Sequence, residues 1–184
     1  MPSTVLCELA VKYGTDKSTI HSYTPIYDAL FAPIRMKVET VLEIGVGYPD
    51  LMRPWVGDHY QTGASLRMWR EYFPLAHIYG IDTNSQCLME EERIQTFIVD
   101  QSRADELQLM VEAIDPVDIV IDDGSHRLDD QIFTATFLWP QAKPGGIYAI
   151  EDCFHPEEII RALGRGEVFT GRKQGDDNLV ILRK

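Results

Sequence analysis

Two short acidic runs hold the residues best suited to chemistry, Ile121-Asp122-Asp123-Gly124-Ser125-His126 and Ile150-Glu151-Asp152. Adjacent carboxylates repel each other, and burial raises that cost unless a cation or a hydrogen-bond donor compensates. Oxygen ligands suit Mg²⁺, Mn²⁺ or Ca²⁺ better than zinc. We therefore predict that Asp123, Glu151 and Asp152 bind a divalent cation, with helix capping as the alternative role for Asp123.

His126 is the candidate general base, since an unperturbed imidazole titrates near about pH 6.5. It follows the predicted ligand Asp123 by three residues. The simpler alternative is a histidine that only makes hydrogen bonds. Asp122 is expected either to be structural or to contact a cofactor.

The elements that must position these groups are two apolar runs at residues 117–121 and 147–150, each of which predicts a buried strand. The carboxyl ends of parallel strands meet at one edge of a sheet, where such folds bind their ligands. The carboxylates and the imidazole should therefore converge at that edge.

A glycine turn, Glu43-Ile44-Gly45-Val46-Gly47, follows an earlier predicted strand at residues 40–44. Glycines let a backbone turn sharply and approach a ligand closely. The full dinucleotide pattern needs a third glycine where this chain has Asp50, so pyrophosphate binding is weakened. A ligand without phosphates, such as S-adenosylmethionine, fits better, and a plain strand-to-helix turn is the alternative.

Polar residues end the next two predicted strands, at residues 77–81 and 96–99. Asp82 is placed to accept hydrogen bonds from ribose hydroxyls. Asp100 and Gln101 are placed to reach an adenine edge. Ordinary capping is the alternative for these acids.

Strands that alternate with helices predict an α/β fold with a mostly parallel sheet covered on both faces. Two closing strands, at residues 167–170 and 179–182, should add an antiparallel edge across a turn at residues 175–178. We expect an irregular loop at residues 48–64 and a short helix at residues 87–93. Further helices are expected at residues 65–73, 104–114, 128–139 and 156–163, and one beginning at Thr24-Pro25.

Composition narrows the function. The chain has 184 residues, enough for one domain, and a net charge of −12, which argues against nucleic acids and anionic membranes. No run of about twenty apolar residues and no signal-peptide pattern appears. Three dispersed cysteines suit a reducing compartment, so a cytoplasmic protein is expected.

Over residues 12–153 the chain resembles the metal- and S-adenosylmethionine-dependent sugar O-methyltransferases of the macrocin and mycinamicin type. Those enzymes also carry a sizeable N-terminal region outside this match. The resemblance rests on Tyr13-Gly14-Thr15-Asp16-Lys17, His21, Tyr23-Thr24-Pro25, Leu42-Glu43-Ile44-Gly45-Val46-Gly47, Ser65-Leu66-Arg67-Met68-Trp69, Gly80-Ile81-Asp82, Asp100-Gln101-Ser102, Ile121 to His126 and Pro144-Gly145-Gly146-Ile147-Tyr148-Ala149-Ile150-Glu151-Asp152.

The resemblance implies a class I methyltransferase fold, a Rossmann-like three-layer sandwich with seven strands and an antiparallel last strand. Residues 1–37 would form an N-terminal cap and residues 38–184 the core of one domain. It implies Mg²⁺ on the three predicted ligands and His126 as the base. The cofactor would contact Tyr13, Thr15, Lys17, His21, Glu43, Gly45, Asp82, Asp100, Gln101 and Asp122.

The expected activity is methyl transfer from S-adenosylmethionine to a hydroxyl of a sugar, a glycoside or another vicinal diol such as a catechol. Two alternatives remain open at this point. One is an NAD-dependent oxidoreductase on a related fold, and the other is a non-catalytic module that binds the cofactor. Self-association into a homo-oligomer also stays open.

Overall fold

The sheet that carries the site is mixed and eight-stranded in the computed structural model, which describes residues 3–171 and 177–184. Its order is β3-β4-β2-β1-β5-β6-β8-β7. The five inner strands from β4 to β6 run parallel, whereas β3, β8 and β7 pair antiparallel with their neighbours. The strands are β1 Thr40–Ile44, β2 His77–Asp82, β3 Glu90–Glu91, β4 Ile94–Ile98, β5 Ile119–Asp122, β6 Ile147–Ile150, β7 Glu167–Thr170 and β8 Asn178–Arg183.

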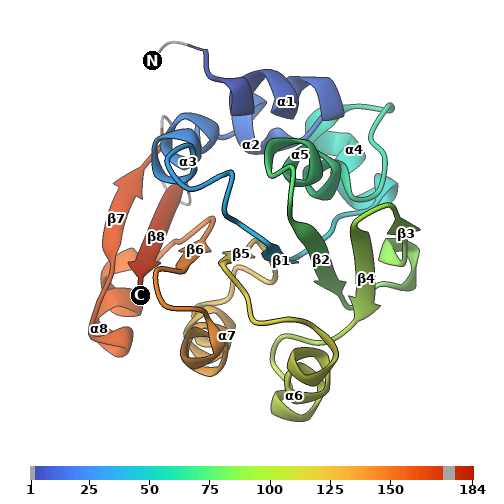
Figure 1. Cartoon of the computed structure of the whole chain (residues 1–184). Coiled ribbons are helices and arrows are strands. Elements are labelled where there is room, and N and C mark those ends of the chain that lie inside the picture. The colour runs from blue at the N-terminus through green and yellow to red at the C-terminus, as the bar shows by residue number, and fades with distance from the viewer. Residues whose placement is uncertain (1–2, 172–176) are drawn as a thin grey trace.

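Helices cover both faces of this sheet, with α1, α3 and α5 on one side and α6, α7 and α8 on the other (Figure 1). The three helices that precede β1 belong to the first of these layers. The α-helices are α1 Val5–Tyr13, α2 Asp16–Thr19, α3 Thr24–Phe31, α4 Pro49–Val56, α5 Ala64–Tyr72, α6 Ala104–Ala113, α7 Leu128–Leu138 and α8 Pro156–Leu163, and the 3₁₀ turns are Ser85–Cys87 and Trp139–Gln141.

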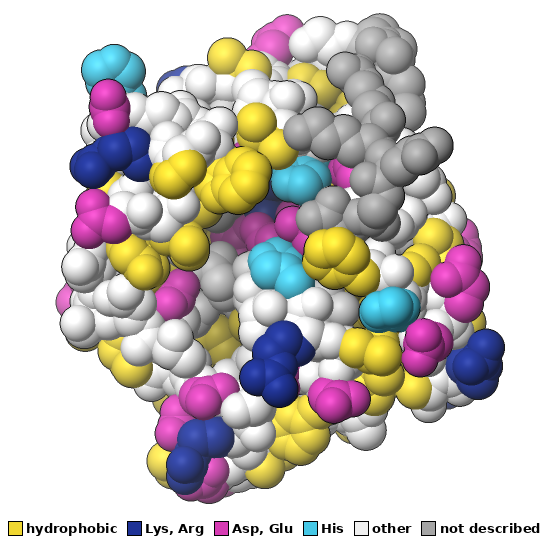
Figure 2. Space-filling view, turned by 180° about the vertical axis from the view of Figure 1, so that it is seen from behind, with side chains coloured by type: hydrophobic (Ala, Val, Ile, Leu, Met, Phe, Trp, Pro, Cys, Tyr) yellow, Lys and Arg dark blue, Asp and Glu magenta, His cyan; other side chains and the backbone are white. Residues whose placement is uncertain are grey.

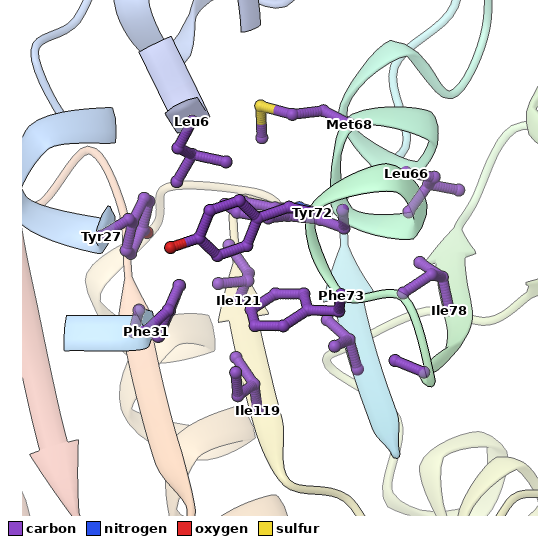
Figure 3. Packing of buried hydrophobic residues seen from close by; sticks show 14 of the residues in the cluster. Leu6, Tyr27, Phe31, Leu66, Met68, Tyr72, Phe73, Ile78, Ile119 and Ile121 are labelled. Atoms are coloured by element: carbon purple, nitrogen blue, oxygen red, sulfur yellow. The ribbon is translucent and has the colours of Figure 1, made fainter. Parts of the chain in front are cut away.

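The core explains why the central strands read as unbroken apolar runs. Every residue of β1, β5 and β6 is buried, as expected for parallel strands sandwiched between helices. On the first face an aromatic cluster fills the space between sheet and helices (Figure 3). Tyr27 stacks on Phe31 with ring centroids 5.2 Å apart and meets Trp69 edge-on at 5.6 Å. This packing fixes α3 and α5 against the sheet.

The fold class is confirmed, and three local predictions need correction. Residues 48–64 contain α4 rather than an unbroken irregular loop, because Pro49 occupies the first helical turn, where its missing N–H costs nothing. Residues 88–93 are not helical, and Cys87 only ends the 3₁₀ turn Ser85–Cys87. They form β3 and a tight turn in which Arg93 adopts a φ of +60°. This short strand is the eighth where seven were expected.

The closing antiparallel pair is confirmed as β7 and β8, and β6, α7 and α8 begin where predicted. Residues 175 and 176 of the predicted turn lie outside the described residues. The assignment of one domain divided near residue 37 stays a prediction. Among the described residues, no helix combines the length and apolarity needed to cross a membrane.

Candidate active site

A cavity of about 700 Å³ opens at the carboxyl ends of the parallel strands. Figure 2 shows it as a hollow with acidic side chains inside and hydrophobic side chains around it. The sequence-predicted site residues on its wall are Thr15, Lys17, His21, Gly45, Asp82, Asp100, Gln101, Asp123, His126 and Asp152. Four others, Tyr13, Glu43, Asp122 and Glu151, do not line it.

The glycine turn after β1 is built as its sequence predicts. Gly45 has a φ of +86°, and its N–H donates to the carbonyl of Ile81 at 2.9 Å. A Cβ on Gly45 would lie 2.0 Å from the backbone oxygen of Asp123. The absence of a side chain therefore lets the turn touch the end of β5, which joins the glycine-turn half of the cavity to the acidic half.

Asp82 holds this turn in place. Its Oδ2 accepts from the N–H groups of Val46 and Gly47 at 3.0 and 3.4 Å, and its Oδ1 accepts from the N–H of Asn84 at 2.9 Å. The carboxylate also lies on the cavity wall, so capping and ligand contact are compatible. Asp100 accepts from the Ser102 N–H and hydroxyl, which lower the pKa of Asp100.

Gln101, on the cavity wall, connects to a buried network that includes Asp122 behind it. The Gln101 amide donates to Asp122 and to Thr134, both at 3.1 Å, and its oxygen accepts from the Ser125 N–H at 2.7 Å. The Tyr148 hydroxyl donates to the second oxygen of Asp122. Burial raises the pKa of Asp122 to about 7. This arrangement supports the structural role of Asp122 rather than a cofactor contact.

Asp123, His126 and Asp152 form the cluster best placed to bind a metal ion, here called the Asp–His–Asp cluster. One ligand atom from each lies within 4.8 Å of the others. His126 Nε2 is 3.9 Å from Asp123 Oδ1, and His126 Nδ1 is 3.7 Å from Asp152 Oδ2. The predicted convergence of β5 and β6 is therefore present, with His126 grouped with the two aspartates in place of Glu151.

Two observations indicate that this cluster fits a divalent cation. His126 Nδ1 is buried, and no described residue makes a hydrogen bond with it. Burial, together with repulsion from Asp123, raises the pKa of Asp152 to about 6. A cation between the two carboxylates and the imidazole would give His126 Nδ1 a partner and would reduce the repulsion between Asp123 and Asp152.

The backbone of the cluster is strained. His126 and Asp152 have φ values of +55° and +50°. Left-handed backbone is uncommon outside glycine and is tolerated best by asparagine, aspartate and histidine. Strain of this kind persists only where the surrounding structure enforces it, and it gathers at functional sites.

Glu151 takes a different position from the one predicted. Both of its oxygens accept from the buried ammonium group of Lys17 at 2.9 Å, and Oε1 also accepts from the Tyr27 hydroxyl at 2.7 Å. Lys17 further contacts Asp123 Oδ2 at 2.6 Å and Glu43 Oε1 at 3.2 Å. Burial raises the pKa of Glu43 and of Glu151. These two glutamates thus lie beneath the cavity, tied to a lysine, and the role of Glu151 as a metal ligand stays a prediction.

The N-terminal segment supplies more of the site than expected. The Tyr23 hydroxyl donates to Asp152 Oδ1, and the His21 ring stacks on Tyr23 with Nδ1 3.5 Å from the same carboxylate oxygen. The predictions missed Tyr23 and Tyr27, although their spacing of four residues would place both phenols on one helical face. Tyr13 instead donates to the exposed Glu71, away from the cavity.

Comparison with known proteins gives relatives with one kind of activity. No protein-family model matches the chain. It is 42% identical over 147 residues to the 8-demethyl-8-alpha-L-rhamnosyl tetracenomycin-C 2'-O-methyltransferase of Streptomyces olivaceus, covering 80% of this chain and 37% of that protein. It is 40% identical over 149 residues to the demethylmacrocin O-methyltransferase of Streptomyces fradiae, covering 80% and 36%.

The chain is also similar to solved structures of methyltransferases. The MycE methyltransferase from the mycinamycin biosynthetic pathway, in complex with Mg, SAH and mycinamycin VI, is 39% identical with a TM-score of 0.72, over 82% of this chain and 37% of that one. An rRNA methylase from Streptococcus thermophilus, 11% identical with a TM-score of 0.58 over 86% and 96% of the two chains, shows the shared fold alone. The chain therefore spans a little over a third of the length of these first relatives.

Proposed function

We propose, on the premise that this chain belongs to the sugar O-methyltransferases of the macrocin and mycinamicin type, that it methylates a sugar hydroxyl of a glycoside with S-adenosylmethionine as the donor. The observation that carries the proposal is the Asp–His–Asp cluster, which shares one cavity with the glycine turn. The Streptomyces olivaceus relative is a methyltransferase named for a rhamnosyl acceptor.

The two ends of the cavity suit two different ligands. The turn at Gly45, together with Asp82 and Asp100, would bind the nucleoside of the donor, and Thr15 and His21 would face its amino-acid end. Asp123 and Asp152 would hold Mg²⁺ at the other end. When bound there, the cation would lower the pKa of an acceptor hydroxyl and orient it.

The chain's own residues account for the rest of the reaction. His126 takes the proton of the acceptor hydroxyl, and the oxygen forms a bond to the methyl carbon as the carbon–sulfur bond breaks. A neutral thioether and a protonated imidazole remain. General-base help of this kind contributes about 10²–10⁴-fold to the rate.

Lys17 orients the carboxylates of the site from beneath the cavity. Its ammonium group holds Asp123 Oδ2, which leaves Asp123 Oδ1 directed to the His126 side of the cluster. Its contacts with Glu43 and Glu151 join β1 to β6 beneath the cavity. Lys17 is a positioning residue in this proposal.

The test is a methyl-transfer assay with a panel of glycosides, read by mass spectrometry, with Mg²⁺ and with EDTA. We expect transfer to at least one sugar hydroxyl, and its loss with EDTA. Calorimetry with S-adenosylhomocysteine and with NAD should show binding of the first alone. Binding of NAD alone would favour the oxidoreductase. Binding of S-adenosylhomocysteine without transfer to any acceptor would favour a non-catalytic module.

A further inference from the structure

Two exposed aromatic side chains at the mouth of the cavity have no role in the chemistry described above. Trp55 is 64% exposed and Phe154 is 58% exposed, and both line the cavity. Among the described residues, the other exposed large aromatic side chain is Phe133, which packs against Phe137 on α7. Trp55 and Phe154 are here called the aromatic rim.

The aromatic rim is held close to both halves of the site. Trp55 lies in the last turn of α4, and α4 packs over the glycine turn, where a Cβ on Gly47 would come within 3.2 Å of Met52. Phe154 follows Asp152 by two residues. The intervening Cys153 is buried and donates its N–H to the carbonyl of Asn178 at 3.1 Å. The backbone that carries the two rings is thus anchored beside the glycine turn and the Asp–His–Asp cluster.

The exposed rings of the aromatic rim favour an apolar ligand, and the acidic residues of the cavity restrict the charge of that ligand. Large aromatic side chains gain free energy when another surface covers them, which makes exposed rings beside a site suited to ligand contact. Asp123 and Asp152 lie deeper in the same cavity, and the chain carries a net charge of −12. Even with a divalent cation on these two carboxylates, the net charge disfavours an anionic acceptor, whereas a neutral one can direct hydroxyl groups inward and keep an apolar group at the mouth.

We propose that Trp55 and Phe154 bind the apolar aglycone of a neutral glycoside and so determine which glycosides are methylated. This inference rests on the proposed function, since it presumes that the sugar hydroxyl occupies the acidic end. It assigns specificity to residues that have no role in the methyl-transfer step proposed above.

The experiment compares methyl α-L-rhamnoside with phenyl α-L-rhamnoside, which differ only in the aglycone. In the wild-type protein kcat/KM should favour the phenyl glycoside. Trp55→Ala and Phe154→Ala should each reduce that preference by about five- to tenfold, while Trp55→Phe retains most of it. Leu109→Ala is the matched control, because Leu109 is 67% exposed on α6 and lies outside the cavity.

Tryptophan fluorescence gives a readout that needs no turnover. Phenyl α-L-rhamnoside, added with S-adenosylhomocysteine and Mg²⁺, should quench the fluorescence of the wild-type protein but not that of Trp55→Phe. This variant keeps Trp69 and Trp139, neither of which lines the cavity. Equal loss of both substrates together with weaker S-adenosylhomocysteine binding in Trp55→Ala would overturn the inference, as would an unchanged preference. Failure of the wild-type protein to methylate any glycoside would instead count against the proposed function, and the fluorescence titration would still decide the role of Trp55.

Discussion

One buried ammonium group, that of Lys17, balances the charges beneath the cavity. It meets three carboxylates, those of Glu43, Asp123 and Glu151, and its side chain is 1% exposed. Desolvation alone would lower the pKa of Lys17, but the three carboxylates raise it well above its ordinary value. The amine therefore stays charged, and the acids depend on it.

Lys17→Met should strongly destabilise the fold. Removal of one partner from a buried ion pair leaves uncompensated charge and costs about 3–5 kcal/mol in the free energy of unfolding. Urea denaturation measures this cost. Lys12→Met is the control, because Lys12 pairs with the exposed Glu71 and lies over the Tyr13 ring at the surface, so its loss should change little. Equal stability of the two variants would show that Lys17 does not hold these acids together.

His126→Ala separates its two candidate roles. If His126 acts only as the base, the substitution should lower kcat by about 10²–10⁴-fold, while Mg²⁺ and S-adenosylhomocysteine still bind. Calorimetry with Mg²⁺ and single-turnover rates give the two readings. Loss of Mg²⁺ binding would instead make His126 a ligand, as its 3.7 and 3.9 Å separations from Asp152 and Asp123 allow. An unaffected rate would remove the base assignment.

At the scale of elements, the contact between the glycine turn and the end of β5 determines the relative placement of the two halves of the site. The close approach of Gly45 to the Asp123 carbonyl is a backbone contact, so no rotation of a side chain can relieve it. A substitution there must move one strand end away from the other.

Gly45→Ala should therefore reduce stability and abolish S-adenosylhomocysteine binding. Gly164→Ala is the matched control, since Gly164 also has a positive φ of +67° but has no atom within 4 Å of the added Cβ. Backbone strain alone costs about 1–2 kcal/mol. Thermal unfolding and calorimetry should show a larger effect at residue 45 than at residue 164. Equal effects would mean that the contact with β5 is unimportant.

The edge strand β3 is fastened to α5 by ion pairs. Glu91 accepts from Arg67 at 2.6 Å and from Arg70 at 3.0 Å, and the hydrogen bond with Arg67 is the main cause that lowers the pKa of Glu91. A depressed folded-state pKa stabilises the protein above the unfolded value of 4.5. This contribution is lost as the pH falls through the lower folded-state pKa.

Glu91→Gln should accordingly lower the Tm at neutral pH and have progressively less effect in acid. The pair is partly exposed, so the change in the free energy of unfolding should be about 1 kcal/mol or less. Thermal melts of both proteins between neutral and acidic pH test this. A difference in Tm that persists unchanged in acid would assign the effect of Glu91 to packing.

At the scale of the whole molecule, stability should be graded across the sheet. β1 and β5 are flanked by strands on both sides and buried throughout, whereas β3 has two residues and β7 is largely exposed at the other edge. Hydrogen exchange should be slowest in β1 and β5 and fastest in β3 and β7. Comparable protection of β7 and β1 would contradict this grading.

Most of this architecture was predictable from periodicity, because strand and helix signals alternate and the acidic runs stand at strand ends. The partner of Glu151 was not, since Lys17 is 134 residues away and no local pattern relates them. The helix α4 was missed because Pro49, Pro54 and Gly57 favour a loop when read alone. The sequence predicted that Asp123 and Asp152 would lie close together, but not that Glu151 would pair with a buried lysine.

The left-handed backbone at residues 126 and 152 also restricts how this protein could diverge. Few residue types accept that conformation, so exchanging either residue would strain the chain even where the new side chain offered similar chemistry. Positions 55 and 154 carry no such restriction. Descendants of a common ancestor could therefore acquire new acceptors by altering the aromatic rim while inheriting the Asp–His–Asp cluster unchanged.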